Sequence, residues 1–141
     1  MSPKPSVTRL RVRYSESDRM GTFYNSRVLE WFECGRTEWL RGAGVPYTRM
    51  ESQGAFLPLV EAHVNYQGRA QYDDELKITT TAVMSGKARI RFDIEIVHAA
   101  AGRPVARGYT VHAITDRSGK PIRPPAWLTQ AFDNDTRPGS K

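Results

Sequence analysis

The sequence predicts an α+β fold in which an antiparallel sheet wraps around one long central helix. One stretch has the hydrophobic spacing of a helix, five stretches have strand patterns, and short connections join the later strands. A single long helix with an apolar stripe must bury that stripe, and only the apolar face of the sheet is large enough to cover it. We therefore expect the sheet to curl around the helix.

The first strand and the helix occupy the N-terminal part of the chain. Residues 7–14 alternate between two faces, as a strand with one buried face does. Residues 25 to about 41 repeat apolar side chains at helical spacing, and Gly42 and Gly44 supply the stop. After this helix, residues 46–54 are expected to form a short helical turn or a loop.

Four further strands are predicted at residues 57–66, 75–85, 88–99 and 105–116. The third has the clearest pattern, because apolar residues alternate with charged ones, so that one face is packed and the other is wet. Its apolar residues are Ile90, Phe92, Ile94 and Ile96. Residues 85–87 and 100–102 are short enough to form hairpins. Open sheet edges can pair with those of a second copy, so we expect a homodimer or a homotetramer.

The 141 residues fit one domain, and a domain of this length buries roughly 70% of the surface of its unfolded chain. We expect this domain to span residues 7–132. Residues 1–6 and 133–141 are rich in Pro, Ser, Gly, Asn and charge and are expected to be disordered. The sequence has no secretory signal and no stretch approaching the ~20 apolar residues of a membrane helix, so we expect a cytoplasmic protein without a membrane span.

Charge, cysteine and histidine content limit the functional classes. A net charge of +6 attracts anionic partners, such as a nucleotide-bearing substrate or a nucleic acid, without choosing between them. The single cysteine, Cys34, excludes a disulfide framework and a cysteine-based metal site within one chain. His63, His98 and His112 lie on three different predicted strands without the spacing of metal ligands, so we predict no metal site.

The turn before the predicted helix carries the residues best suited to chemistry. Asp18 and Gly21 lie in this turn, and Asn25 follows as a residue of N-cap type. The start of a helix offers unpaired N–H groups and a positive dipole, which suit an oxyanion. Taken alone, Asp and Gly between a strand and a helix usually indicate an ordinary turn.

Longer motifs support a functional interpretation. The pattern Y-x-x-S-D-x-x-G-x-x-Y-N-x-x-x-L-x-W-F-E-x-x-R-T-E-W-L spans residues 14–40. Y-D-D-E-L at 72–76, G-K at 86–87, G-R-P-V-A-R-G-Y-T-V at 102–111 and D-R-S-G-K-P at 116–121 follow. In this order they resemble the 4-hydroxybenzoyl-CoA thioesterase family over nearly the whole domain. The resemblance implies the hotdog fold, hydrolysis of an acyl-CoA thioester to free CoA and a carboxylic acid, and no cofactor besides the CoA of the substrate.

The resemblance also implies roles for individual residues. Asp18 matches the catalytic carboxylate of the family, which acts either as a nucleophile, giving a mixed anhydride, or as a general base for water. A backbone N–H of Asn25, or of its neighbour Tyr24, falls where the family polarises the thioester carbonyl. Candidates for binding the phosphates of CoA are Lys87, Arg89, Arg91 and Arg123. Lys87 has the best positional match, whereas a solvated strand face is an equal interpretation of Arg89 and Arg91.

Two departures from the family, at positions 25 and 28, leave the acyl group unassigned, and a third, at position 88, removes one possible hydroxyl contact to the coenzyme. Asn25 stands where many relatives have His, Val28 where they often have an aromatic residue, and Ala88 where some have Ser. Acyl carrier protein thioesters therefore stay open beside acyl-CoA, with the reactive site expected at a dimer interface.

The sequence leaves two alternative functions to consider. A hotdog dehydratase or hydratase needs paired His and Asp or Glu motifs that the sequence lacks. A non-catalytic acyl-CoA-binding or nucleic-acid-binding module is the other alternative. Asp18 argues against a protein that only binds acyl-CoA, and the sequence has no nucleic-acid-binding motif.

Overall fold

The computed structural model describes residues 5–17 and 22–133. The chain begins with the strand β1 (Ser6–Arg11), the short 3-10 helix η1 (Tyr14–Glu16), the long helix α1 (Arg27–Gly42) and the short helix α2 (Tyr47–Ser52). Four strands follow, β2 (Leu59–Tyr66), β3 (Glu75–Met84), β4 (Arg89–His98) and β5 (Pro104–Ala113), and then the helix α3 (Ala126–Asp133). The predicted order of strands around one long helix is confirmed, whereas η1 and α3 were not predicted.

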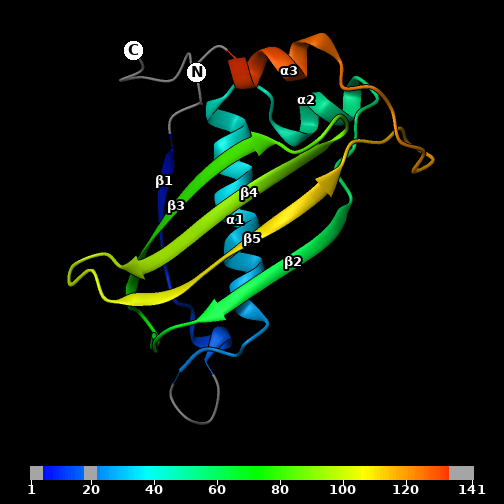
Figure 1. The fold of residues 1–141 in the computed structure, drawn as a ribbon. Coiled ribbons are helices and arrows are strands. Elements are labelled where there is room, and N and C mark those ends of the chain that lie inside the picture. The colour runs from blue at the N-terminus through cyan, green and yellow to red at the C-terminus, as the bar shows by residue number, and fades with distance from the viewer. Residues whose placement is uncertain (1–4, 18–21, 134–141) are drawn as a thin grey trace.

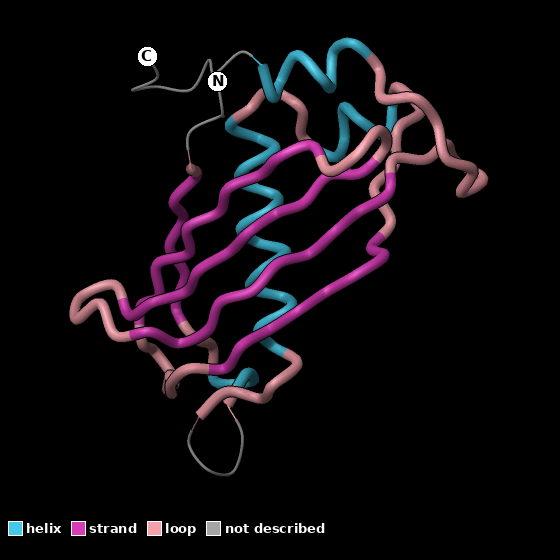
Figure 2. Tube along the Cα trace, viewed as in Figure 1, coloured by secondary structure: helices cyan, strands magenta, loops and turns pink. Residues whose placement is uncertain are grey.

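The five strands form one antiparallel sheet in the order β1-β3-β4-β5-β2. The long helix α1 lies across one face of this sheet, as Figure 1 and Figure 2 show. This arrangement confirms the predicted α+β architecture. The strands β1 and β2 form the two edges, and the face turned away from α1 is called the outer face below.

The core lies between α1 and the sheet. The large residues that α1 buries are Val28, Trp31, Phe32, Trp39 and Leu40. The four apolar residues predicted for β4 are all buried, while their charged neighbours point to the outer face. Burying a side chain of this size contributes about 1.5–3 kcal/mol. The helix and the sheet therefore hold each other in place, and the start of α1 is fixed relative to the strands.

The helix α3 closes one end of this core. Leu128 is fully buried, and the rings of Phe132 and Trp39 lie 5.1 Å apart between centroids. The helix begins directly after Pro125, whose carbonyl accepts the N–H of Leu128 at 3.0 Å. Among the residues that the structure describes, no helix is both long enough and apolar enough to cross a membrane.

The two ends of the sheet differ. Arg11 of β1 lies opposite Glu75 of β3, and the chain continues from there into η1; we call this the loop end. At the other end Met84 lies opposite Ile90, and residues 85–88 connect β3 to β4; we call this the hairpin end. The strand β3 joins the two ends with 10 residues, a length of about 33 Å. Residues at different ends therefore cannot line one small pocket within a single chain.

Candidate active site

The described residues on the two sides of Asp18 are held next to each other. Asp18 itself lies outside the described residues, so its predicted role stays a prediction. On either side of it, Ser17 and Phe23 form an antiparallel bridge. The Thr22 hydroxyl donates to the carbonyl of Ala70 at 3.2 Å and accepts the N–H of Ala70 at 3.3 Å. The two chain segments that flank residues 18–21 are thus fixed side by side at the loop end.

The helix α1 begins directly after this region, and two backbone N–H groups before its first turn have no backbone partner among the described residues. The cap residue Ser26 makes no side-chain capping hydrogen bond. The N–H of Tyr24 donates to the carbonyl of Glu16 at 3.0 Å, so it is already used. Within the described ranges, neither Asn25 nor Ser26 donates its N–H to a backbone carbonyl. Of the two predicted oxyanion donors, the geometry therefore favours Asn25 over Tyr24.

Peptide planarity fixes the direction of these N–H groups. The carbonyl and the N–H of a trans peptide point in opposite directions. The Tyr24 carbonyl accepts the N–H of Arg27 at 3.0 Å, so the N–H of Asn25, in the same peptide, points away from the helix. The Asn25 carbonyl accepts the Tyr66 hydroxyl at 2.7 Å, which fixes the next peptide in turn. The start of α1 thus presents N–H groups outward, where the positive end of the helix dipole favours developing negative charge.

The predicted phosphate-binding residues lie away from this turn. Lys87 and Arg89 are exposed at the hairpin end. Arg123 is exposed in the segment after β5, next to Ile122, whose N–H donates to the carbonyl of Ile114 at 3.0 Å. Ile114 in turn donates its N–H to Ala88 of the hairpin, so Arg123 belongs to the same end. These three cations therefore lie at the hairpin end, whereas Ser17 and residues 22–25 lie at the loop end.

Arg91 has partners within its own sheet. Its guanidinium donates to both carboxylate oxygens of Asp93, at 3.0 to 3.2 Å, and lies 3.9 Å above the ring of Tyr109. The hydrogen bond to Asp93 raises the pKa of Arg91. These contacts favour the interpretation of Arg91 as part of a solvated strand face over a role in binding CoA.

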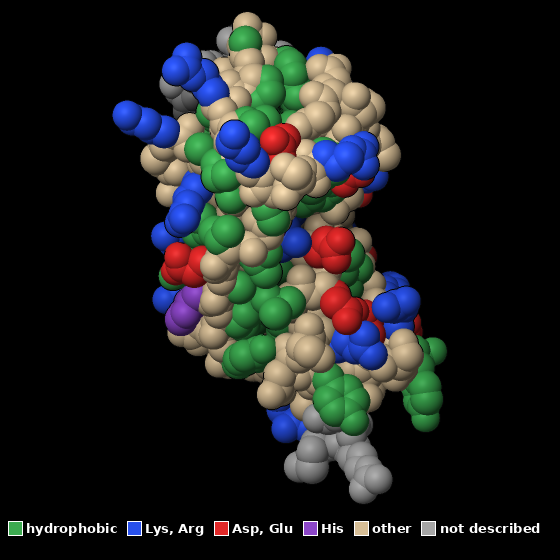
Figure 3. Space-filling model, turned by 90° about the vertical axis from the view of Figure 1, so that its right-hand side faces the viewer, with side chains coloured by type: hydrophobic (Ala, Val, Ile, Leu, Met, Phe, Trp, Pro, Cys, Tyr) green, Lys and Arg blue, Asp and Glu red, His purple; other side chains and the backbone are tan. Residues whose placement is uncertain are grey.

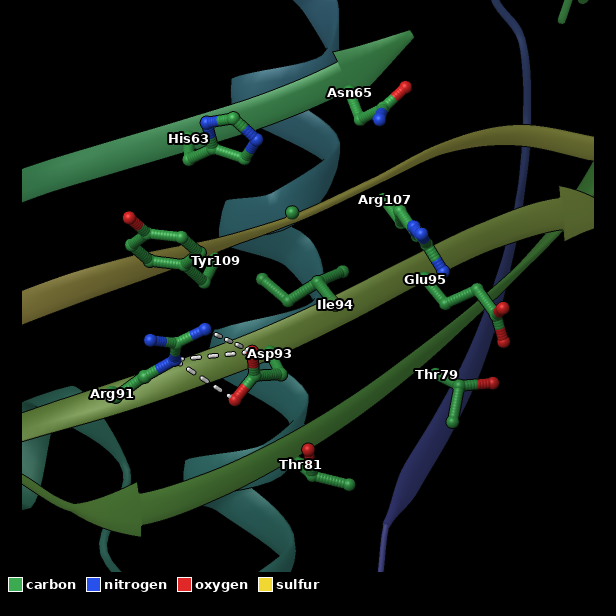
Figure 4. A pocket seen from close by; sticks show the side chains of 11 residues that line it. His63, Asn65, Thr79, Thr81, Arg91, Asp93, Ile94, Glu95, Arg107 and Tyr109 are labelled. Carbon is green, nitrogen blue, oxygen red and sulfur yellow. Dashed lines mark hydrogen bonds and ion pairs between the residues drawn. The ribbon is translucent and has the colours of Figure 1, made fainter. Parts of the chain in front are cut away.

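The outer face carries a shallow hollow around these residues. Figure 4 shows its lining, with a volume of about 480 Å³. The Tyr109 hydroxyl donates to Glu61 at 2.7 Å, and the His63 ring stacks on Tyr109 with centroids 5.5 Å apart. Arg91 and Asp93 of the lining are thus paired with each other, and the hollow lies across the sheet from α1. Its lining includes neither Ser17 nor any of residues 22–25.

The remaining titratable side chains take structural positions. His112 is buried, with Nδ1 3.0 Å from the Leu57 carbonyl and Nε2 3.0 Å from the Thr110 hydroxyl, and burial lowers its pKa to about 4. His98 Nε2 lies 2.7 Å from the Arg69 carbonyl. Burial, followed by the charge of Glu33, raises the pKa of the Cys34 thiol, which disfavours the reactive thiolate. In the described part of the chain, no three His, Cys, Asp or Glu residues are grouped to hold a metal.

Comparison with known proteins identifies the family. The family model described as Thioesterase-like superfamily matches residues 12–132. The chain belongs to this superfamily. The protein of Bacillus subtilis named "Putative acyl-CoA thioesterase YneP" is 33% identical over 75 residues, which cover 53% of this chain and only 54% of that relative. A 1,4-dihydroxy-2-naphthoyl-CoA hydrolase of Synechocystis is 28% identical over 129 residues, which cover 89% of this chain and 93% of that protein.

Solved structures of thioesterases share the fold. The DHNA-CoA thioesterase from Staphylococcus aureus superposes with a TM-score of 0.78 at 30% identity, covering 84% of this chain and 80% of that one. The predicted hotdog fold and the predicted resemblance to thioesterases are confirmed.

Sequence reasoning missed two side chains that hold this region together, Glu16 and Tyr66. Glu16 precedes Asp18 by two residues and would ordinarily be interpreted as a solvated acid, yet it is 3% exposed. Tyr66 ends the edge strand β2, 41 positions from its hydrogen-bond partner Asn25. Only the fold brings them to the helix start, and no spacing in the sequence indicates these contacts.

Proposed function

We propose that this protein is an acyl-CoA thioesterase, in which Asp18 is the reactive carboxylate and the N–H of Asn25 is the oxyanion donor. One observation carries the proposal: the segments flanking Asp18 are fixed beside a helix start whose N–H groups point outward. Thioester hydrolysis is the chemistry of the superfamily to which the chain belongs. CoA enters as part of the substrate.

The proposed reaction needs a nucleophile on one side of the thioester carbonyl and a donor on its oxygen. As a general base, Asp18 takes a proton from water while the water oxygen bonds to the carbonyl carbon. As a nucleophile, it forms a mixed anhydride that water then hydrolyses. In both routes negative charge develops on the carbonyl oxygen, where the Asn25 N–H stabilises it. The carbon–sulfur bond then breaks, and the CoA thiolate leaves and is protonated.

The second element of the proposal is a site shared by two copies. Lys87, Arg89 and Arg123 lie at the hairpin end, whereas the segments that flank Asp18 lie at the loop end, so within one chain they are at opposite ends of the 10-residue strand β3. Antiparallel pairing of two β2 strands about a two-fold axis places the hairpin end of one copy beside the loop end of the other. We propose a homodimer of this kind, alone or doubled into a homotetramer.

The exposed edge of the sheet supports such pairing. Leu59 and Val60 are 51% and 46% exposed on β2, and Tyr66 is 48% exposed at its end. Figure 3 views the molecule from the side of this edge and shows hydrophobic side chains gathered along it, with charged side chains on both sides. Exposed apolar side chains beside unpaired strand backbone are typical of a surface that another strand covers.

A thiol-release assay tests the function. Purified protein is offered a panel of aromatic and aliphatic acyl-CoAs and the same acyl groups on an acyl carrier protein, with Asp18→Asn as the control for contaminating activity. Release of thiol by the wild-type protein, lost in the control, supports the proposal and reports the acyl preference. Release at the same rate by both proteins would remove Asp18 from the mechanism.

We place the protein in the cytoplasm, in agreement with its single free thiol, Cys34.

A further inference from the structure

The carboxylate of Glu16 is buried, although acids are rarely buried without partners. Its Oε1 accepts the backbone N–H of Arg13 at 2.7 Å. Its Oε2 accepts the indole N–H of Trp31 at 3.1 Å and a guanidinium N–H of Arg13 at 3.3 Å. Trp31 belongs to α1, so this one carboxylate ties the segment before residues 18–21 to the helix.

Glu16 and Trp31 also hold the segment that follows residues 18–21. The Trp31 ring, itself fully buried, packs against the ring of Phe23 with centroids 5.0 Å apart. The backbone carbonyl of Glu16 accepts the N–H of Tyr24 at 3.0 Å. Three segments, 13–17, 23–25 and the first turns of α1, therefore meet in one hydrogen-bonded and packed unit centred on Glu16.

This unit fixes the peptide that carries the proposed oxyanion donor. The Glu16 carbonyl holds the N–H of Tyr24, which belongs to the preceding peptide, and the N–H of Arg27 holds the carbonyl of the peptide between Tyr24 and Asn25, so both peptides that flank the Cα of Tyr24 are fixed. An apolar residue at position 16 would fill the space but could not accept hydrogen bonds from Arg13 or Trp31. A carboxylate with two oxygens accepts donors from the segment and from the helix at once, which sets their relative position.

We propose that Glu16 is a positioning residue for thioester hydrolysis, acting through Trp31 and Tyr24 on the N–H of Asn25. The inference rests on the proposed function, and Glu16 itself does not touch the substrate. Because the oxyanion forms only in the transition state, misplacing its donor lowers kcat and leaves KM nearly unchanged. A displacement of about 1 Å in such a group costs up to about 100-fold.

Two single variants and their combination test the proposal. Glu16→Gln keeps the shape, but its amide nitrogen cannot accept a donor, so one of the two links is lost. Trp31→Phe keeps a ring against Phe23 and removes only the indole N–H. We expect each to lower kcat about 10- to 100-fold with KM within about 3-fold. If the two act as one unit, the double variant has about the kcat of the slower single variant.

Control variants separate positioning from a general effect of losing charge or fold. Glu38→Gln removes an acid of α1 that pairs at the surface with Arg41, and it should leave kcat unchanged. Glu16→Asp keeps the charge but shortens the reach by one methylene. It should be as slow as Glu16→Gln, whereas recovery of kcat in this variant would show that charge alone matters. All rates are measured where circular dichroism shows each variant folded. If Glu16→Gln does not fold, Trp31→Phe decides.

A readout independent of turnover separates this inference from the proposed function. Hydrogen exchange at the Tyr24 amide, whose N–H donates to Glu16, should be accelerated at least about 10-fold in Glu16→Gln and in Trp31→Phe. Unchanged exchange, or kcat within 2-fold of wild type in both variants, would overturn the positioning role. Accelerated exchange in a protein that hydrolyses no thioester would instead retain the structural unit and reject the proposed function.

Discussion

Gly35 provides a test of how closely α1 approaches the sheet. It lies on the buried face of α1, where a Cβ would overlap Thr80 Oγ1 and lie 3.0 Å from Ile78 Cγ2. Both neighbours on β3 are fully buried. Gly35→Ala therefore overpacks the helix against the strand, which costs about 1–3 kcal/mol. Alanine is better than glycine in a helix interior by about 1 kcal/mol. The net result is a loss of up to about 2 kcal/mol in the free energy of unfolding.

Urea unfolding, followed by circular dichroism and extrapolated to water, measures this loss. The second measurement places Gly35→Ala in a Thr80→Ala background, where the overlapping hydroxyl is gone. Thr80 Oγ1 is buried without a hydrogen-bond partner in the described residues, so its removal breaks no hydrogen bond there. In that background Gly35→Ala should cost less than about 0.5 kcal/mol or should stabilise the protein through helix propensity. A Gly35→Ala protein that is about 1 kcal/mol more stable than wild type would refute the close approach, because helix propensity alone gives that gain.

Four other outcomes follow from the site and the fold. Asp18→Asn should lower kcat at least ~100-fold in the thiol-release assay while thermal unfolding stays unchanged, because the amide is neither nucleophile nor base. Lys87→Ala should raise KM for acyl-CoA several-fold with kcat unchanged, and should lose that effect on an acyl-pantetheine substrate and at high salt. His112, with its pKa lowered to about 4, should make the native state less stable as pH falls below 6.5. The unfolded chain takes up the proton first, so the free energy of unfolding falls by about 3 kcal/mol by pH 4. Urea unfolding of His112→Gln at the same pH values should not show this loss. Sedimentation at micromolar concentration should show a dimer or a tetramer, and a monomer would contradict pairing through β2.

Hydrophobic alternation predicted the strands well because each strand has one buried face. In β4, residues 90, 92, 94 and 96 are buried as predicted. Boundaries were less accurate where backbone contacts continue beyond the regular strand. The last strand was predicted to reach residue 116 but ends at Ala113, and Thr115 then forms isolated bridges to Phe56 and Pro121. The predicted helix start at residue 25 moves to Arg27, because residues 25 and 26 form the turn that precedes it.

The helix α3 was missed for a different reason. Its eight residues are too short to show a helical repeat, and they lie between prolines and a polar terminus. What makes them helical is tertiary, since Leu128 and Phe132 bury their side chains at the end of the core beside Trp39. Packing of this kind decides short helices, and it is invisible to propensity or spacing.

The candidate site divides in the same way. Family motifs identified the turn and the hairpin, because both are continuous in sequence. They could not show that the hairpin end and the loop end are opposite ends of one sheet, since that depends on strand order and register. Nor could they show that Arg91 is held by Asp93 and Tyr109. The contact between Glu16 and Trp31 spans 15 residues and the whole turn, so it too appears only in the folded chain.

The packing of α1 supports the proposal that the substrate binds at a surface between two chains. Trp31, Phe32 and Trp39 fill the space between the helix and the sheet and are at most 1% exposed. We therefore expect an acyl group to lie outside the core that this helix closes, along the sides of α1 or over the open edge of β2. In the proposed homodimer, a second copy covers that edge and at the same time brings cations from its hairpin end to the loop end. The large side chains of α1 fill the space against the sheet, which stabilises the single chain but leaves no cavity between helix and sheet. In the proposed dimer, the cavity for the substrate therefore forms at the interface.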